Sequence, residues 1–91
     1  MQRPGEHKTR WDLVPFSELD KVAQCFTKGA EKHDDEGWKT IPNAKEKYFA
    51  AAMRHIAAYR GGQVVDTETR QSHLTCAISN LMIVNYHTGG Q

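Results

Sequence analysis

The residues best suited to chemistry are concentrated between positions 54 and 80, a stretch that holds histidines, carboxylates and an asparagine. His73, Asn80 and His87 recur at intervals of seven, which places them on one side of a helix, and Asp66 continues the series one step upstream. This polar row runs beside an apolar stripe rather than opposite it, so the pattern predicts the wall of an internal cleft. The alternative is that Asp66 caps a helix and the others lie on a partly wet surface; spacing alone favours neither.

Three helices must position these side chains. Apolar periodicity predicts helices over residues 17–32, 44–60 and 69–86. Ser17 is the expected cap of the first. Because the connection 61–68 is short and contains paired glycines, the second and third helices should lie antiparallel. The stripes expected to face the core are Leu19, Val22, Ala23, Phe26 and Ala30, then Tyr48, Phe49, Ala52, Met53, Ile56 and Tyr59, then Leu74, Ala77, Ile78, Leu81 and Val84.

The chain is expected to form a single all-α domain, an antiparallel helical bundle over residues 1–91 with a flexible arm at 1–10. No strand-like alternation is long enough to build a sheet. A chain of 91 residues encloses only a small core, so we expect self-association as a dimer or tetramer to complete it.

Composition narrows the possible partners and location. Twelve basic and eleven acidic residues leave no charge surplus that would attract nucleic acid or a membrane surface. The chain has no run of 18 apolar residues and no secretory-type N-terminal segment, which favours the cytoplasm. Cys25 and Cys76 match no metal-binding spacing and are expected to be reduced, partly buried thiols.

Two residues in the first half of the chain are unusual for their positions. Gly29 lies inside the first predicted helix, where glycine costs about 1 kcal/mol relative to alanine. Close approach of another helix or of a ligand would explain it. Trp38 lies in the loop at 33–43, where it can cap the core or stack on an aromatic base; the sequence slightly favours the core.

An ordered set of segments resembles the N-terminal domain of phage-type dATP/dGTP diphosphohydrolases, a group that looks related to the MazG-like all-α nucleotide pyrophosphohydrolases. The resemblance covers roughly residues 8 to 86. The segments that carry it are KTRWDLVP at 8–15, TKGAEKH at 27–33, Trp38, Arg54-His55, Tyr59-Arg60-Gly61, Asp66-Thr67-Glu68, His73-Leu74 and Asn80.

The resemblance implies a helical, often oligomeric enzyme that uses a divalent metal to split a deoxynucleoside triphosphate, with purines the expected bases, into monophosphate and pyrophosphate. Mg²⁺ or Mn²⁺ is the expected cofactor, and the host cytoplasm the expected location if the chain is phage-encoded. The acidic helical signatures of MazG-type enzymes are absent. Glu31, His33 and Arg70 stand where the pattern leads us to expect a basic residue, an aromatic residue and a glycine.

The metal ligands cannot be transferred from the family pattern, so the candidate site residues are chosen by the chemistry that the implied reaction needs. Such a reaction builds charge on phosphate oxygens, so it needs a metal ion in oxygen ligands, cationic clamps and a group that moves protons. The candidates are Asp66, Glu68 and Asp20 for the metal, His55, His73 and Glu68 for catalysis, and Lys28, Lys32, Trp38, Arg54 and Asn80 for the substrate. The alternative is a non-catalytic helical module that binds a nucleotide or a protein, which the missing acidic signatures favour.

Overall fold

A computed structural model describes residues 8–32 and 34–89. Its elements are η2 (Trp11–Leu13), α1 (Phe16–Lys32), η3 (Gly37–Lys39), α2 (Ala44–Arg60) and α3 (His73–Gly89). The predicted all-α class is confirmed, since the described residues form no strand and carry only an isolated bridge between Val65 and Ser72. Most of the expected N-terminal arm lies outside the described residues.

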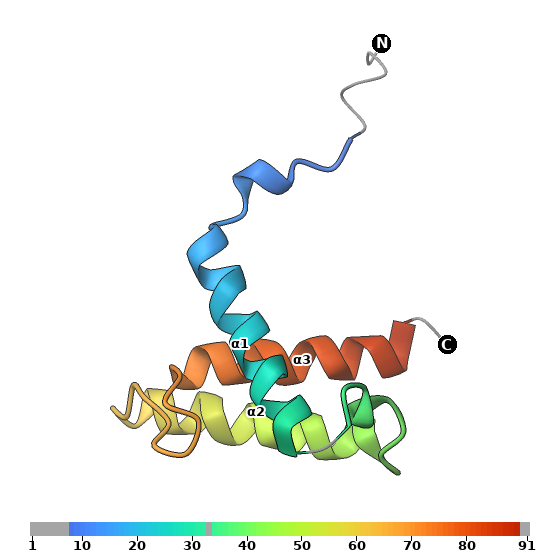
Figure 1. Cartoon of the computed structure of the whole chain (residues 1–91). Helices are drawn as coiled ribbons and strands as arrows, with labels where there is room; N and C mark the ends of the chain where they lie inside the picture. The colour runs from blue at the N-terminus through green and yellow to red at the C-terminus, as the bar shows by residue number, and fades with distance from the viewer. Residues whose placement is uncertain (1–7, 33, 90–91) are drawn as a thin grey trace.

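The helices are arranged as an antiparallel pair crossed by a third. Figure 1 shows α2 and α3 side by side and running in opposite directions, as predicted, with the second half of α1 crossing them. The first half of α1 and η2 extend away from the pair (Figure 1). Every residue from Trp11 to Lys21 is accordingly exposed.

Two helix starts differ from the prediction. α1 begins at Phe16, ahead of Ser17, because the Pro15 carbonyl already accepts hydrogen bonds from the amides of Glu18 and Leu19 at 3.0 and 3.2 Å. α3 begins at His73 rather than at position 69, and its capping oxygen is Ser72 Oγ, which accepts from the Leu74 amide at 3.1 Å.

The late start of α3 is explained by a small closed loop in the connection. The amide of Asp66 donates to the Gln71 carbonyl, and the amide of Arg70 donates to the Asp66 carbonyl, both at 2.8 Å. The His73 amide donates to the Val64 carbonyl at 2.8 Å. These bonds give the backbone of residues 64–72 its own partners, so the segment does not continue into the helix.

The core is small and consists of short side chains at the helix crossings. The described apolar residues that are buried are Val22, Ala44, Ala52, Cys76, Ala77 and Ile83. None of the described helices is long and apolar enough to cross a membrane.

The rotation of α3 departs from the prediction. Leu74, Ile78 and Leu81, expected in the core, are 39%, 48% and 40% exposed, while His73 is buried. Because Cys76, Ala77 and Ser79 are small, α1 and α2 can approach α3 on the face that contains the polar row. The buried face of α3 therefore carries polar and small side chains together with Ile83, while Leu74, Ile78 and Leu81 of the predicted stripe face outward.

Candidate functional site

A cavity of about 560 Å³ lies between α1, α2, α3 and the loops that join them. The structure brings six of the predicted site residues to its wall: Lys28, Lys32, Trp38, His55, Glu68 and Asn80. Gly29 also lines the cavity, and a Cβ atom added there would meet nothing within 4 Å. Close packing of another helix against the position of that Cβ therefore does not explain this glycine.

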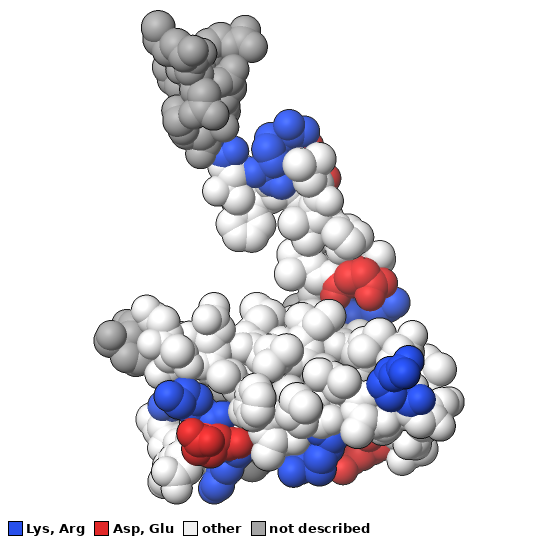
Figure 2. All heavy atoms as spheres, turned by 180° about the vertical axis from the view of Figure 1, so that it is seen from behind, with Lys and Arg blue, Asp and Glu red and all other residues white. Residues whose placement is uncertain are grey.

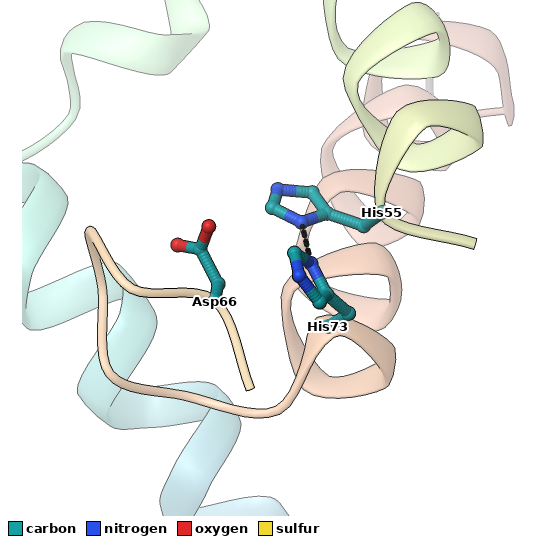
Figure 3. A group of neighbouring side chains, drawn as sticks. All are labelled: His55, Asp66 and His73. Atoms are coloured by element: carbon teal, nitrogen blue, oxygen red, sulfur yellow. Dashed lines mark hydrogen bonds between the residues drawn. The ribbon is translucent and has the colours of Figure 1, made fainter. Parts of the chain in front are cut away.

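Next to the cavity, His55 of α2, Asp66 of the connection and His73 of α3 form a cluster. One ligand atom from each lies within 4.8 Å of the other two. The Nδ1 atoms of the two histidines are 2.8 Å apart, and Figure 3 shows the Asp66 carboxylate beside the two rings. The cluster thus joins three of the residues selected from the sequence.

His73 is the most enclosed member of this cluster. Its side chain is 5% exposed, and within the described part of the chain its Nε2 atom is buried without a hydrogen-bond partner. Buried polar atoms are almost always paired, because an unpaired one loses its hydration without compensation. In the Nδ1 to Nδ1 contact, one nitrogen must carry a hydrogen while the other accepts it.

The local charges favour neutral histidine opposite ionised aspartate. Burial lowers the pKa of His55 from its ordinary value of 6.5, against the opposing effect of Asp66. Burial alone would raise the pKa of Asp66, but hydrogen bonds from Thr69 and the neighbouring histidines outweigh it and lower the pKa from 3.8. At neutral pH, His55 therefore offers a lone pair and Asp66 a carboxylate, the forms that bind metal ions.

Thr69, a residue that the sequence analysis did not select, holds the carboxylate in place. Its amide and its hydroxyl donate to Asp66 Oδ2 at 2.9 and 2.8 Å. Thr69 Oγ1 also lies 3.3 Å from the Sγ of Cys76, and the Thr69 carbonyl accepts from Lys28 Nζ at 3.0 Å. The spacing Asp-x-x-Thr, which is typical of a side-chain-closed turn, is the sequence signal that could have identified it.

The structure does not bring three other predicted residues into the cluster. Glu68 lines the cavity but is paired with Lys32 at 2.9 Å on the exposed rim, so it is not among the candidate metal ligands. Asp20 is exposed on the part of α1 that extends away, where it accepts from Gln24. Arg54 is exposed and is not among the residues that line the cavity.

Trp38 belongs to an aromatic group, of which Phe26 and Trp38 line the cavity. Its ring makes edge contacts with Phe26 and Tyr86 at centroid distances of 5.9 and 4.9 Å. His87, the last member of the polar row, donates through Nε2 to the Trp38 carbonyl at 3.0 Å. Trp38 therefore packs against the core, as the sequence slightly favoured, while part of it still lines the cavity.

The thiols also border the cavity. Cys25 and Cys76 are free, as expected, and Cys76 is buried. Burial raises the pKa of the Cys76 thiol, with a smaller opposing effect from its hydrogen bond to Thr69. We therefore expect this thiol to stay protonated at neutral pH.

Comparison with known proteins identifies the family of this chain. No curated protein and no solved structure matches the chain. The model of one protein family, described as "dATP/dGTP diphosphohydrolase, N-terminal", matches residues 2–89. This match covers nearly the whole chain, including every residue of the cluster and of the cavity wall, and it agrees with the resemblance seen in the sequence. The chain therefore belongs to the dATP/dGTP diphosphohydrolase N-terminal family.

Proposed function

We propose that this domain binds a purine deoxynucleoside triphosphate in the cavity between its helices and takes part in its metal-dependent hydrolysis to monophosphate and pyrophosphate. The observation that carries the proposal is the position of His55, which belongs both to the cavity wall and to the cluster with Asp66 and His73. A metal ion held by the cluster would lie next to whatever occupies the cavity.

The charges of the cavity support a role for a cation. Its wall contains two lysines, Lys28 and Lys32, and three carboxylates, Glu31, Asp34 and Glu68, which leaves a net charge of 2 − 3 = −1 with neutral histidine. A triphosphate carries several negative charges, so these side chains alone would not attract it. A divalent cation would neutralise part of that charge, which is the usual arrangement for phosphate substrates.

Each side chain then has a defined task. A bound ion supplies positive charge to the phosphate oxygens and lowers the pKa of a coordinated water. His55, Asp66 and His73 would hold that ion, so the histidines serve as ligands rather than as proton carriers. Lys28 and Lys32 would neutralise the outer phosphates. Trp38 and Asn80 line the same cavity and would contact the base or the sugar.

The test is to incubate the protein with each deoxynucleoside triphosphate and Mg²⁺ or Mn²⁺ and to separate the products. Monophosphate plus pyrophosphate is the expected outcome, whereas diphosphate plus phosphate would contradict cleavage between the α and β phosphates. If no product forms but nucleotide raises the melting temperature, the domain is a non-catalytic nucleotide-binding module.

A paired substitution tests the position of the substrate. Lys28→Met and Lys32→Met should each weaken nucleotide binding, since they remove a cation from the cavity wall. Lys21→Met is the matched control, because Lys21 is exposed on the same helix and pairs with Glu18 at 3.0 Å, away from the cavity. Equal nucleotide affinity in all three variants would place the substrate elsewhere.

A further inference from the structure

We propose that the cluster of His55, Asp66 and His73 is a binding site for a first-row transition metal, of the class of Mn²⁺, Fe²⁺, Co²⁺ or Zn²⁺, rather than for Mg²⁺. This inference deepens the proposed function, because it assigns the metal of the same site. Its test measures metal binding without nucleotide, so it can fail or succeed independently of hydrolysis.

The first argument is the chemistry of the donor atoms. Two imidazole nitrogens and one carboxylate oxygen converge from α2, α3 and the connection, within 4.8 Å of one another. Magnesium prefers oxygen ligands and retains its water molecules, whereas imidazole suits the later divalent metals. Within the described residues, Glu68 and Asp20 are not part of this group, so Asp66 supplies its only carboxylate.

The second argument is the contact between the two histidines. Nitrogens bound to one ion at about 2.0–2.1 Å lie about 2.8–3.4 Å apart for bond angles between 90° and tetrahedral. The Nδ1 atoms are 2.8 Å apart, at the lower end of that range, so opening the pair by at most about 0.6 Å would reach any spacing within it. Without an ion, the two Nδ1 atoms share one hydrogen bond in this part-buried site, and both imidazoles could exchange it for bonds to the metal.

The third argument is that a neighbouring residue fixes the carboxylate. Thr69 donates two hydrogen bonds to Asp66 Oδ2 and is itself held by Lys28 from α1. Second-layer partners of this kind orient metal ligands and typically contribute 10–100-fold to affinity. Three protein ligands leave coordination positions open, and His55 faces the cavity, so the site has the character of a catalytic rather than a structural centre.

The test is calorimetric titration of chelator-treated protein with Mn²⁺, Co²⁺, Zn²⁺ and Mg²⁺ in separate experiments, with the Co²⁺ absorption spectrum as a second readout. We expect each transition metal to bind at least ~10-fold more tightly than Mg²⁺. Nitrogen ligation should also give Co²⁺ visible bands that differ from those of the aqueous ion. Mg²⁺ binding as tight as Mn²⁺ binding, or an unchanged Co²⁺ spectrum, overturns the assignment.

Variants locate the ion. His55→Gln and Asp66→Asn keep the size of their side chains and should each lower Mn²⁺ affinity at least ~10-fold. The controls are His87→Gln, a histidine of α3 that bonds Trp38 instead, and Asp20→Asn, a carboxylate far from the cluster. Circular dichroism verifies that each variant is folded. If the cluster variants retain wild-type affinity, or if the controls lose as much, the site is not this cluster.

Discussion

Arg70 has a backbone conformation that suits glycine. Its φ angle is +62°, in the left-handed region, and its amide closes the small loop by donating to the Asp66 carbonyl at 2.8 Å. A non-glycine residue in this region typically costs about 1–2 kcal/mol. The family resemblance noted in the sequence leads us to expect glycine at this position, and the structure supplies a physical reason: Arg70, in the turn that presents Asp66, has a positive φ.

We therefore expect Arg70→Gly to stabilise the domain. Relief of the backbone strain is partly offset by the greater freedom of glycine in the unfolded chain, so the gain in free energy of unfolding should be about 0.5–1 kcal/mol. Urea denaturation measures it. Arg70→Ala is the matched control, since it removes the same side chain but keeps the Cβ atom; equal stabilisation by both variants would show that the charge, not the φ angle, is responsible.

Thr69 should act on the metal through Asp66. Thr69→Val removes the hydroxyl that donates to Asp66 Oδ2 while preserving the volume of the side chain. We expect about a 10-fold loss of Mn²⁺ affinity, measured by calorimetry. Thr69→Ser keeps the hydroxyl and should restore most of the binding. Equal losses in the two variants would mean that the methyl group, through packing, is what matters.

For individual residues, the spacing in the sequence identified which side chains come together. It did not predict the direction of a side chain where that direction depends on the rotation of a helix about its axis or on a local turn. His73 follows Asp66 by seven positions, and the short connection returns α3 to the end of α2, so their approach to His55 could be predicted. Glu68 lies two positions from Asp66, yet the turn closed by Thr69 directs it to Lys32 on the rim. The periodicity of the sequence does not predict that Asp66 and Glu68 point to different places.

Among the elements, α1 contains an internal glycine that faces the cavity. Gly29→Ala should raise the free energy of unfolding by up to about 1 kcal/mol, because the added methyl group meets no neighbour and alanine is the better helix former. The same methyl group would project into the space proposed for the nucleotide. We therefore expect a more stable protein with weaker nucleotide affinity, measured by thermal melting and calorimetry respectively.

Gly62 is the control for that experiment. It ends α2 with a φ of +103°; its amide donates to the Tyr59 carbonyl and the next amide, of Gln63, donates to Ala58. This pair of bonds is the Schellman arrangement that glycine favours. Gly62→Ala should therefore lower stability, although an added Cβ would meet nothing within 4 Å there either. If nucleotide binding is weaker in the Gly29 variant but unchanged in the Gly62 variant, the loss of affinity comes from the cavity and not from a change in stability.

The sequence predicts where the helices begin and end better than it predicts which face of each helix is buried. The predicted span of α2 agrees with the structure, because apolar periodicity, the paired glycines and Pro42 fix both ends. Of the apolar stripe predicted for α3, Ala77 is buried, whereas Leu74, Ile78 and Leu81 are exposed. A hydrophobic pattern identifies the surface that must be buried, but it does not say whether the same chain or another one buries it.

For the molecule as a whole, the outward face of α3 is the feature that a single chain does not explain. The sequence of α3 contains no Lys, Arg, Asp or Glu, and a helix without a charged face is typical of buried helices. Figure 2, seen from behind, shows a largely uncharged surface on the body of the domain. The exposed large apolar side chains of the two paired helices include Phe49 and Met53 of α2 and Leu74, Ile78, Leu81 and Met82 of α3.

The last prediction is that a second copy of the chain covers this apolar face. The residues of this face recur at helical spacing: Phe49 and Met53 on α2, and Leu74, Ile78 and Leu81 on α3. The cavity is lined by other residues of the same two helices, namely Tyr48, His55 and Asn80. A patch of this kind on a small domain is typical of an interface, and the near-neutral net charge of +1 opposes association little.

Ile78→Lys should therefore convert the dimer into a monomer, because the ammonium group would have to be buried without a partner in the interface. Light scattering and sedimentation over a range of concentrations measure the mass. Thr67→Lys is the control, since it adds the same charge at an exposed position in the connection, away from both paired helices.

Wild-type protein whose mass stays that of one chain at every concentration would refute the prediction. If the Ile78 variant has the mass of the wild-type dimer, the interface lies on another surface, such as the exposed apolar residues of η2 and the start of α1.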